Sequence, residues 1–112
     1  MKILRLGNDI CELADIENSA ESIRAEIGGG IEVIPLNKSL RLVINADRRQ
    51  CKGLTVNKPA SSIFMHDGGM SVIIGRAFLC SYDGIGDLDS LTADDFETAK
   101  KILTSYGYTK GD

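Results

Sequence analysis

Tryptophan is absent from this 112-residue sequence, and its aromatic residues are three phenylalanines and three tyrosines beside one histidine. Isoleucine, leucine and valine must therefore build most of the core. No apolar run approaches the roughly 18 residues that a membrane-spanning helix requires. The opening MKILRLGNDI holds a short apolar run before Gly, Asn and Asp, which is typical of a first strand and too short for a signal peptide. We expect a soluble, cytoplasmic protein without membrane contact.

Cysteine is scarce and scattered. Cys11, Cys51 and Cys80 are odd in number, lie far apart and include no C-x-x-C pair. Neither a disulfide framework nor a zinc site is indicated by this spacing. We expect three reduced, partly buried thiols and no bound metal.

The glycine-rich and aspartate-rich stretches lack the spacing of known ligand loops. The glycines of IGGGIE follow a helical pattern instead of leading into one, so they predict a helix cap and a tight turn rather than a phosphate loop. DGIGDLD fails as an EF-hand loop, because Ile85 occupies position 3 counted from Asp83, and Leu91 occupies position 5 counted from Asp87. We expect no cofactor.

Catalytic groups are equally sparse. The single histidine, His66, has Asp67 beside it and serines at 61 and 62, which allows a small hydrolase with His66 and Ser61 or Ser62 as one weaker hypothesis. A triad is defined by geometry that no spacing here fixes, and no carboxylate pair nominates a general acid and base. The sequence favours a protein that is not an enzyme, and no catalytic residue is assigned.

The length corresponds to a single domain over residues 1–112. Asn18 or Ser19 can cap a helix that Gly28 ends in the left-handed region, and Thr92 with Asp95 resembles a capping box. The remaining patterns alternate between strand and helix. The predicted strands cover 2–6, 30–37, 39–45, 51–56 and 71–82, and the predicted helices cover 18–27, 59–64 and 91–103.

The connections between these elements indicate the fold class. Strands 30–37, 39–45 and 51–56 are joined by segments too short for a parallel crossover, so they predict an antiparallel meander. The most apolar strand, 71–82, is expected at the centre of the sheet, and 66–70 is expected to be a glycine-rich loop. We predict an α+β fold, with an antiparallel or mixed sheet of about five strands and the two main helices packed on one face.

The formal net charge of −3 conceals a strong segregation of charge. Residues 9–26 carry six acids and one base, residues 38–58 carry six bases and one acid, and residues 83–97 carry six acids and no base. This pattern fits complementarity within or between subunits, or a local anion site on an acidic protein. A nucleic-acid partner is not expected, because nucleic-acid-binding domains are usually basic overall.

The basic middle segment holds the candidate binding residues. Arg48 and Arg49 lie at a predicted turn, where either guanidinium could bind a phosphate or carboxylate with two hydrogen bonds. The segment also fits a solvated turn, or pairing with the acidic helices of a second subunit. The candidate ligand-binding residues are Arg48, Arg49, Lys52, Asn57 and Lys58.

Four stretches in this order, IGGGIEVIPL, LVINADRRQCKGLTVNKPA, VIIGRAFLCS and SLTADDFE, resemble a family of small proteins catalogued as domain of unknown function 3846. The resemblance covers about residues 20–96. Members often carry acids and a glycine after the turn asparagine, where this chain has Ala46, Asp47, Arg48 and Arg49, which sets the basic turn apart from the family pattern. The motif positions are Gly28, Gly29, Ile31, Glu32, Asn45, Gly53, Leu54, Asn57, Gly75, Leu91 and Thr92.

The resemblance implies an accessory protein of a phage, prophage or other mobile element, and such proteins often act by binding. Our first hypothesis is a homo-oligomeric binding protein that counters host defence by sequestering a small anionic, nucleotide-type signal. The second is an inhibitor whose acidic residues between Asp83 and Glu97 bind a host defence protein.

Overall fold

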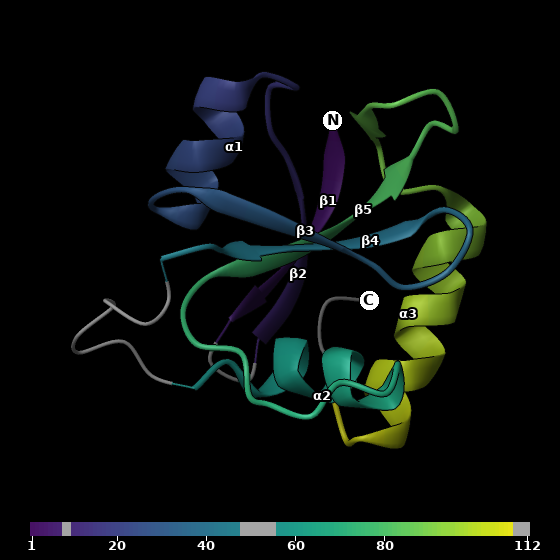
Figure 1. The fold of residues 1–112 in the computed structure, drawn as a ribbon. Coiled ribbons are helices and arrows are strands. Elements are labelled where there is room, and N and C mark those ends of the chain that lie inside the picture. The colour runs from purple at the N-terminus through teal and green to yellow at the C-terminus, as the bar shows by residue number, and fades with distance from the viewer. Residues whose placement is uncertain (8–9, 48–55, 109–112) are drawn as a thin grey trace.

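The computed structural model describes residues 1–7, 10–47 and 56–108 as strands and helices around one sheet (Figure 1). The strands are β1 (Lys2–Gly7), β2 (Ile10–Asp15), β3 (Ile31–Pro35), β4 (Leu40–Asn45), β5 (Ala77–Tyr82) and β6 (Leu88–Asp89). The helices are α1 (Ala20–Ile27), α2 (Lys58–His66) and α3 (Ala93–Ser105). No helix of the described ranges is long and apolar enough to cross a membrane.

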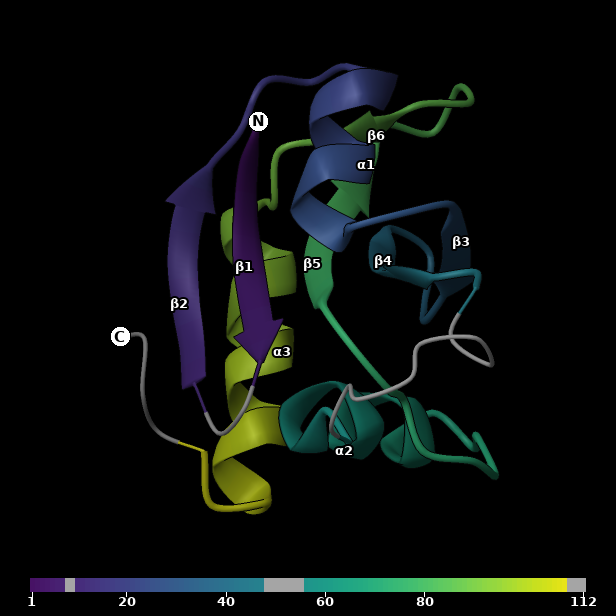
Figure 2. The same cartoon turned by 90° about the vertical axis from the view of Figure 1, so that its left-hand side faces the viewer.

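All strand pairs of the sheet are antiparallel, in the order β2-β1-β5-β4-β3, with β6 beside the end of β5 (Figure 2). The apolar strand β5 lies at the centre, between β1 and β4, as its composition predicts. The antiparallel sheet and its helices confirm the α+β class. Two strands were not predicted: β2, which pairs with β1 along its whole length, and the short β6.

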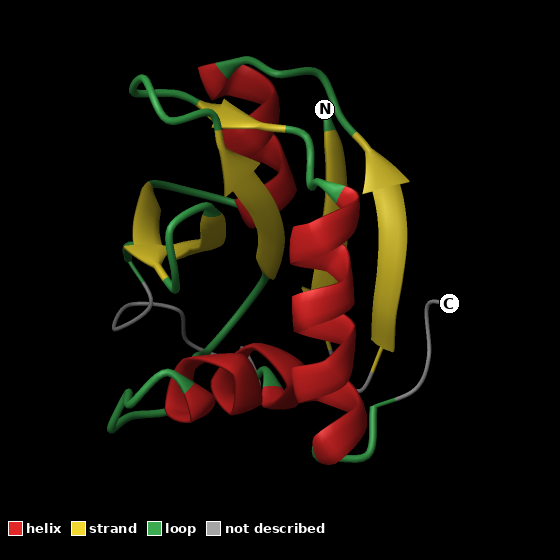
Figure 3. Ribbon diagram, turned by 90° about the vertical axis from the view of Figure 1, so that its right-hand side faces the viewer, coloured by secondary structure: helices red, strands yellow, loops and turns green. Residues whose placement is uncertain are grey.

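The helices cover both faces of the sheet, so the prediction that the two main helices share one face is wrong. Along β5, Leu79 belongs to the core cluster beneath α2 and α3, whereas Phe78 belongs to the cluster beneath α1. The view in Figure 2 has α1 in front of the sheet, and the opposite view in Figure 3 has α3 in front, with α2 across the lower end of the strands. The helix α1 connects the two edge strands β2 and β3 and therefore crosses the face that α3 leaves open.

The ends of α1 follow the predicted capping chemistry. Ser19 accepts a hydrogen bond from the backbone N–H of Ser22 at 3.1 Å. At the other end Gly28 adopts φ +87°, and its N–H donates to the carbonyl of Arg24 at 2.7 Å. A left-handed residue at this place satisfies a terminal carbonyl at little steric cost only if it is glycine.

The start of α3 uses a longer relay than the predicted capping box. Thr92 accepts from the N–H of Asp95 at 3.2 Å, as in a capping box. The N–H of Thr92, however, does not donate to the carboxylate of Asp95 as a capping box requires. Instead the N–H of Thr92 donates to the hydroxyl of Ser81 (3.0 Å), which donates to Asp95 (2.6 Å). Ser39 donates to the other carboxylate oxygen at 2.9 Å. Buried Asp95 therefore joins α3 to the ends of β4 and β5.

Three other predictions differ from the structure: the start of β5, the third strand of the meander and the end of α2. Strand β5 begins at Ala77 rather than residue 71, because Gly75 turns the chain with φ +90°. Both edges of β4 are occupied by β3 and β5, so no third strand of a meander can pair with it. Residues 51–55 of that predicted strand lie outside the described ranges, and Val56 forms only an isolated bridge with Ile74. His66 closes α2 instead of opening a loop.

Two of the cysteines are buried thiols, as predicted. Cys11 lies in the core beneath α2 and α3, and Cys80 lies beneath α1. Burial raises the pKa of Cys11 to about 11 and that of Cys80 to about 12. Cys51 lies outside the described ranges.

Candidate ligand-binding site

The five predicted binding residues fall into three groups. Arg48, Arg49 and Lys52 lie outside the described ranges. Lys58 is exposed at the first residue of α2. Asn57 caps the same helix and is only 1% exposed. A ligand in solution could therefore contact Lys58 but not the side chain of Asn57.

The side chain of Asn57 is fully engaged inside the protein. Its oxygen accepts from the N–H of Ala60 at 3.1 Å. Its amide nitrogen donates to the carbonyls of Leu6 (2.9 Å) and Gly75 (2.8 Å). Both amide hydrogens and the oxygen are thus used by the fold. Asn57 fixes the start of α2 against the end of β1 and the residue before Arg76.

A cleft of about 610 Å³ lies on the α1 side of the sheet, between β1 and α1. Its lining comes from β1, α1, Arg76 and the segment between β2 and α1, with apolar side chains from Ile16 and Ala25 and an arginine on each of two sides. The lining residues are Arg5, Leu6, Gly7, Ile16, Glu17, Ser22, Ala25, Glu26 and Arg76. Because the end of β1 pairs with the start of β5, Gly7 and Arg76 belong to the same end of the sheet.

Arg5 forms a fixed wall of this cleft. Its Nε and Nη2 donate to the two carboxylate oxygens of Glu26 at 2.5 and 2.9 Å, and its Nη1 donates to Glu12 at 2.9 Å. Both carboxylates favour the charged guanidinium, Glu26 more strongly, and they raise the pKa of Arg5 above its usual value. The charge of Arg5 is therefore already balanced within the protein.

Arg76 is the more available cation. Its side chain is exposed, and within the described ranges its guanidinium makes one long hydrogen bond, 3.5 Å, to the carbonyl of Ala25. Gly28 lies beside it, since a Cβ there would be 3.9 Å from Nη1 of Arg76. No carboxylate forms an ion pair with Arg76 within those ranges. A ligand anion could therefore bind this guanidinium without displacing a protein carboxylate.

The described residues that flank the basic turn lie at the same end of the sheet. The N–H of Ala46 donates to Gly30 at 2.9 Å, and Asp47 accepts from the N–H of Gly30 at 3.4 Å. On the other side of the turn, Val56 pairs with Ile74, two residues before Arg76. The described residues on both sides of the basic turn, Asp47 and Val56, therefore lie at the end of the sheet that holds Arg76.

The basic middle of the sequence does not form one patch. Arg41 lies at the opposite end of β4 from Asn45, and its guanidinium stacks on the ring of Tyr82 at 4.5 Å. It also donates to the carbonyl of Asn37 at 2.8 Å. Arg41 therefore braces the turn between β3 and β4, far along the sheet from Arg76.

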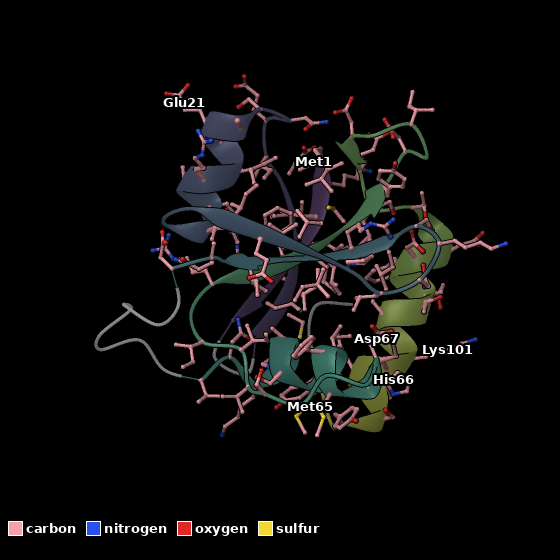
Figure 4. The ribbon with its side chains drawn as sticks, viewed as in Figure 1. Met1, Glu21, Met65, His66, Asp67 and Lys101 are labelled. Carbon is pink, nitrogen blue, oxygen red and sulfur yellow. The ribbon has the colours of Figure 1, made fainter. Side chains whose placement is uncertain are left out.

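A second, smaller cleft of about 300 Å³ lies between α2, α3 and the turn before β4. His66 and Asp67 lie at the end of α2 beside α3, as the side chains in Figure 4 show. The cleft is lined by Leu36, Asn37, Leu40, Ile63, His66, Asp67, Thr98 and Ile102. No arginine or lysine lies among its lining residues in the described parts of the chain, so it offers an anion far less than the cleft beside α1.

The serines considered for hydrolysis have backbone partners. Ser61 accepts from the N–H of Ile73 at 2.8 Å and is buried, and Ser62 donates to the carbonyl of Lys58 at 3.0 Å. In the described parts of the chain no hydrogen bond joins either serine to His66, whose ring meets Tyr106 edge-on at 6.5 Å. Nor do those parts place three or more His, Cys, Asp or Glu side chains together as metal ligands.

The carboxylates of Asp83, Asp89 and Asp95, three of the six acids between Asp83 and Glu97, accept hydrogen bonds within the protein. Asp83 accepts from the N–H groups of Ile85 (2.8 Å) and Asp87 (3.1 Å), and these bonds lower its pKa. Asp95 is the buried acceptor of the serine relay. Asp83 remains an exposed acid, whereas burial removes Asp95 from the acidic surface that the sequence indicates.

The fold is an α+β protein with an antiparallel sheet, helices on both faces and a charged cleft at one sheet end. The chain belongs to the family described as domain of unknown function (DUF3846), whose model matches residues 1–105. This confirms the family resemblance and extends it to β1, β2 and most of α3. No curated protein and no solved structure matches the chain.

The family motif positions described by the structure have roles in folding. Gly28 ends α1 and Thr92 begins α3. Asn57 bonds to the carbonyl of Gly75, and Asn45 accepts from the N–H of Asp47 at 2.7 Å. The bonds of Asn57 and Asn45 lie at the sheet end that carries the cleft, whereas Thr92 lies at the other end of β5. Arg5 and Arg76 themselves were missed by sequence reasoning, because each is a single charge in an apolar stretch, 71 positions from the other.

Proposed function

We propose that this protein is a non-enzymatic accessory binding protein of a phage or mobile element. It sequesters a small anionic, nucleotide-type ligand in the host cytoplasm and thereby withholds a signal from host defence. The observation that carries this proposal is the exposed Arg76, which borders the cleft beside α1 and has no carboxylate partner in the described ranges.

The size and lining of the cleft support a small molecule. Its volume of about 610 Å³ falls within the range of roughly 300–1,000 Å³ for small-molecule sites. Ile16 and Ala25 offer an apolar surface for a flat ring, while Arg76 offers two parallel N–H donors to a phosphate. A nucleotide combines these two chemical features.

The basic turn extends this proposal. Arg48 and Arg49 follow directly on Asp47 in sequence, and Lys52 comes three residues after Arg49. Lys58 follows Asn57, whose amide bonds to the residue before Arg76. We assign these four residues to additional contacts with phosphate. Asn57 has the separate role of positioning the sheet end, because its polar atoms are already bonded.

The first test is native mass spectrometry of the protein purified from cells, followed by calorimetric titration with ADP and with inorganic pyrophosphate. We expect a retained or titratable nucleotide. Arg76→Ala should weaken ADP binding about 10- to 100-fold, the loss typical of a charge-assisted hydrogen bond. Arg24→Ala is the matched control, because Arg24 is exposed on α1 and does not line the cleft.

The two probes separate the parts of the site. Binding of both ADP and pyrophosphate, weakened equally by Arg76→Ala, would assign this guanidinium to the phosphates. Binding of neither probe, with no nucleotide retained on purification, would contradict the proposal. Equal losses for Arg76→Ala and Arg24→Ala would also contradict it, since only long-range charge would then act.

A further inference from the structure

The two edges of the sheet differ in their capacity to accept another strand. The edges are β2 on one side and β3 on the other (Figure 2). An edge strand presents a row of unpaired N–H and C=O groups, and proteins usually block that row with proline, charge or a covering segment. The registers of these two strands show which backbone groups point outward.

On β3 the outward row is interrupted. The N–H of Ala46 donates to the carbonyl of Gly30, and the N–H of Leu36 donates to the carbonyl of Leu40. In this register the backbone N–H and C=O groups of the even-numbered residues of β3 point toward β4. Residues 31, 33 and 35 therefore face outward. Pro35 stands in this row and has no N–H, which is a common device for protecting an edge.

On β2 the outward row is complete. The N–H of Ile16 donates to Met1 at 2.9 Å, so the even-numbered residues of β2 face β1 and the odd-numbered ones face outward. Cys11, Leu13 and Asp15 each offer one N–H and one C=O there. In the described ranges no backbone hydrogen bond uses these groups. Leu13, at the centre of the row, leaves 54% of its surface exposed, a large value for leucine.

We propose that β2 is the dimerisation edge of this protein, where it pairs antiparallel with β2 of a second copy across a two-fold axis at Leu13. This register opposes Leu13 to its own copy and Cys11 to Asp15 of the second copy. All outward groups of the three residues then form ladder hydrogen bonds. The interface is isologous, as a closed two-fold dimer requires.

The charges on β2 favour this register over its neighbours. With the axis at Leu13, Glu12 lies opposite Ala14, and Asp15 lies opposite Cys11, so no two acids face each other. Moving the axis to Glu12 would oppose two glutamates, which is destabilising in directly opposed positions. Moving it to Ala14 would oppose Leu13 to Asp15 and leave Cys11 beyond the partner strand. Only the register at Leu13 pairs the full row.

The dimer also relates the two ligand clefts. A two-fold axis perpendicular to the sheet places both α1 helices on the same face, and Glu12 of β2 is already bonded to Arg5, which lines the cleft. The two clefts would lie on one face of a continuous sheet, on either side of the axis. This inference does not depend on the ligand proposal.

The test is the mass of the protein in solution by light scattering after size exclusion. We expect twice the chain mass of 12.1 kDa. Leu13→Pro removes an outward N–H that the monomer does not use, and it should give the single-chain mass with an unchanged circular dichroism spectrum. Val33→Pro is the matched control, because it makes the same change in the outward row of β3 and should leave the dimer intact.

A cross-link tests the register and remains informative if Leu13→Pro fails to fold. Opposed residues in a hydrogen-bonded antiparallel pair have Cα atoms about 5.5 Å apart, within the roughly 4.4–6.8 Å that a disulfide spans. Leu13→Cys in a Cys51→Ser background should therefore cross-link on oxidation, and Val33→Cys should not. A wild-type protein at the single-chain mass, or a Leu13→Cys variant that stays uncross-linked, would overturn the proposal.

Discussion

The two faces of the sheet differ in the burial of the polar side chains that hold each of them. On the face covered by α2 and α3, the side chains of Asn57, Ser61 and Asp95 are buried and bonded to other parts of the chain. On the α1 face, Arg76 and Glu17 border an open cleft and remain exposed. Groups that already stabilise the fold are poor ligands for anything else, so the proposed ligand site belongs to the second face.

The largest expected effect on stability is at Asn57, which sequence analysis took for a ligand-binding residue and the structure shows as a buried helix cap. Asn57→Ala leaves the carbonyls of Leu6 and Gly75 and the N–H of Ala60 without this partner. We expect a loss of about 3 kcal/mol in the free energy of unfolding, as for a lost helix cap plus unsatisfied buried groups. Chemical denaturation measures it. Asn18→Ala, which removes one exposed bond to Leu88, should cost far less.

A smaller but clear effect is expected at Asp95. Asp95→Ala leaves the hydroxyls of Ser39 and Ser81 without their acceptor and should cost about 2 kcal/mol in thermal or chemical unfolding. The neighbouring Asp94 is exposed in the first turn of α3, and Asp94→Ala should change stability by only about 0.5 kcal/mol. Equal losses for the two variants would show that the relay does not stabilise the fold.

On the α1 face the ion pair of Arg5 and Glu26 should contribute less to the free energy of unfolding than its short hydrogen bonds indicate. The Arg5 side chain is 40% exposed, so solvent screens the pair. We expect Glu26→Gln to cost at most about 1 kcal/mol, and to cost less as salt is added. Glu12→Gln, in the more exposed of the two pairs, should cost less still. A loss as large as that of Asn57→Ala would break the distinction between the faces.

The smallest effects concern the two buried thiols, one beneath each face. Because burial raises both pKa values, the folded protein holds these protons at a pH where the unfolded chain releases them. Their contribution to stability is thus complete below pH 9 and lost as pH rises toward about 11 for Cys11 and about 12 for Cys80. Ellman's reagent should label both slowly in the native protein. Fast labelling of Cys80 alone would show that the core beneath α1 opens.

Local signals in the sequence predicted the helix ends well, because capping depends on residues close in the chain. Ser19, Gly28 and Thr92 are examples, and Pro59 correctly marked the first turn of α2. The role of Asn57 could not be read in this way. An asparagine before a helix suits a cap or a ligand contact, and the deciding carbonyl of Leu6 lies 51 residues away.

The errors in the fold have a common physical cause. In β2, the exposed Leu13 and the acids Glu12 and Asp15 hide the two-residue alternation of a strand. Without β2 as an edge strand, nothing in the sequence shows that α1 must cross the sheet from one edge to the other. The apolar stripe of a helix identifies its buried side but not the face of the sheet that it covers. The cleft formed by that crossing was therefore beyond sequence reasoning.

The most direct test of the central claim is a ¹⁵N–¹H NMR titration of the wild-type protein with ADP, read residue by residue. We predict that the amide signals of Gly7, Ser22, Ala25 and Arg76 shift with a common saturation curve, and that Arg76→Ala abolishes these shifts. Saturable shifts at Leu36, His66 and Ile102 instead would place binding on the α2 and α3 face and contradict the account.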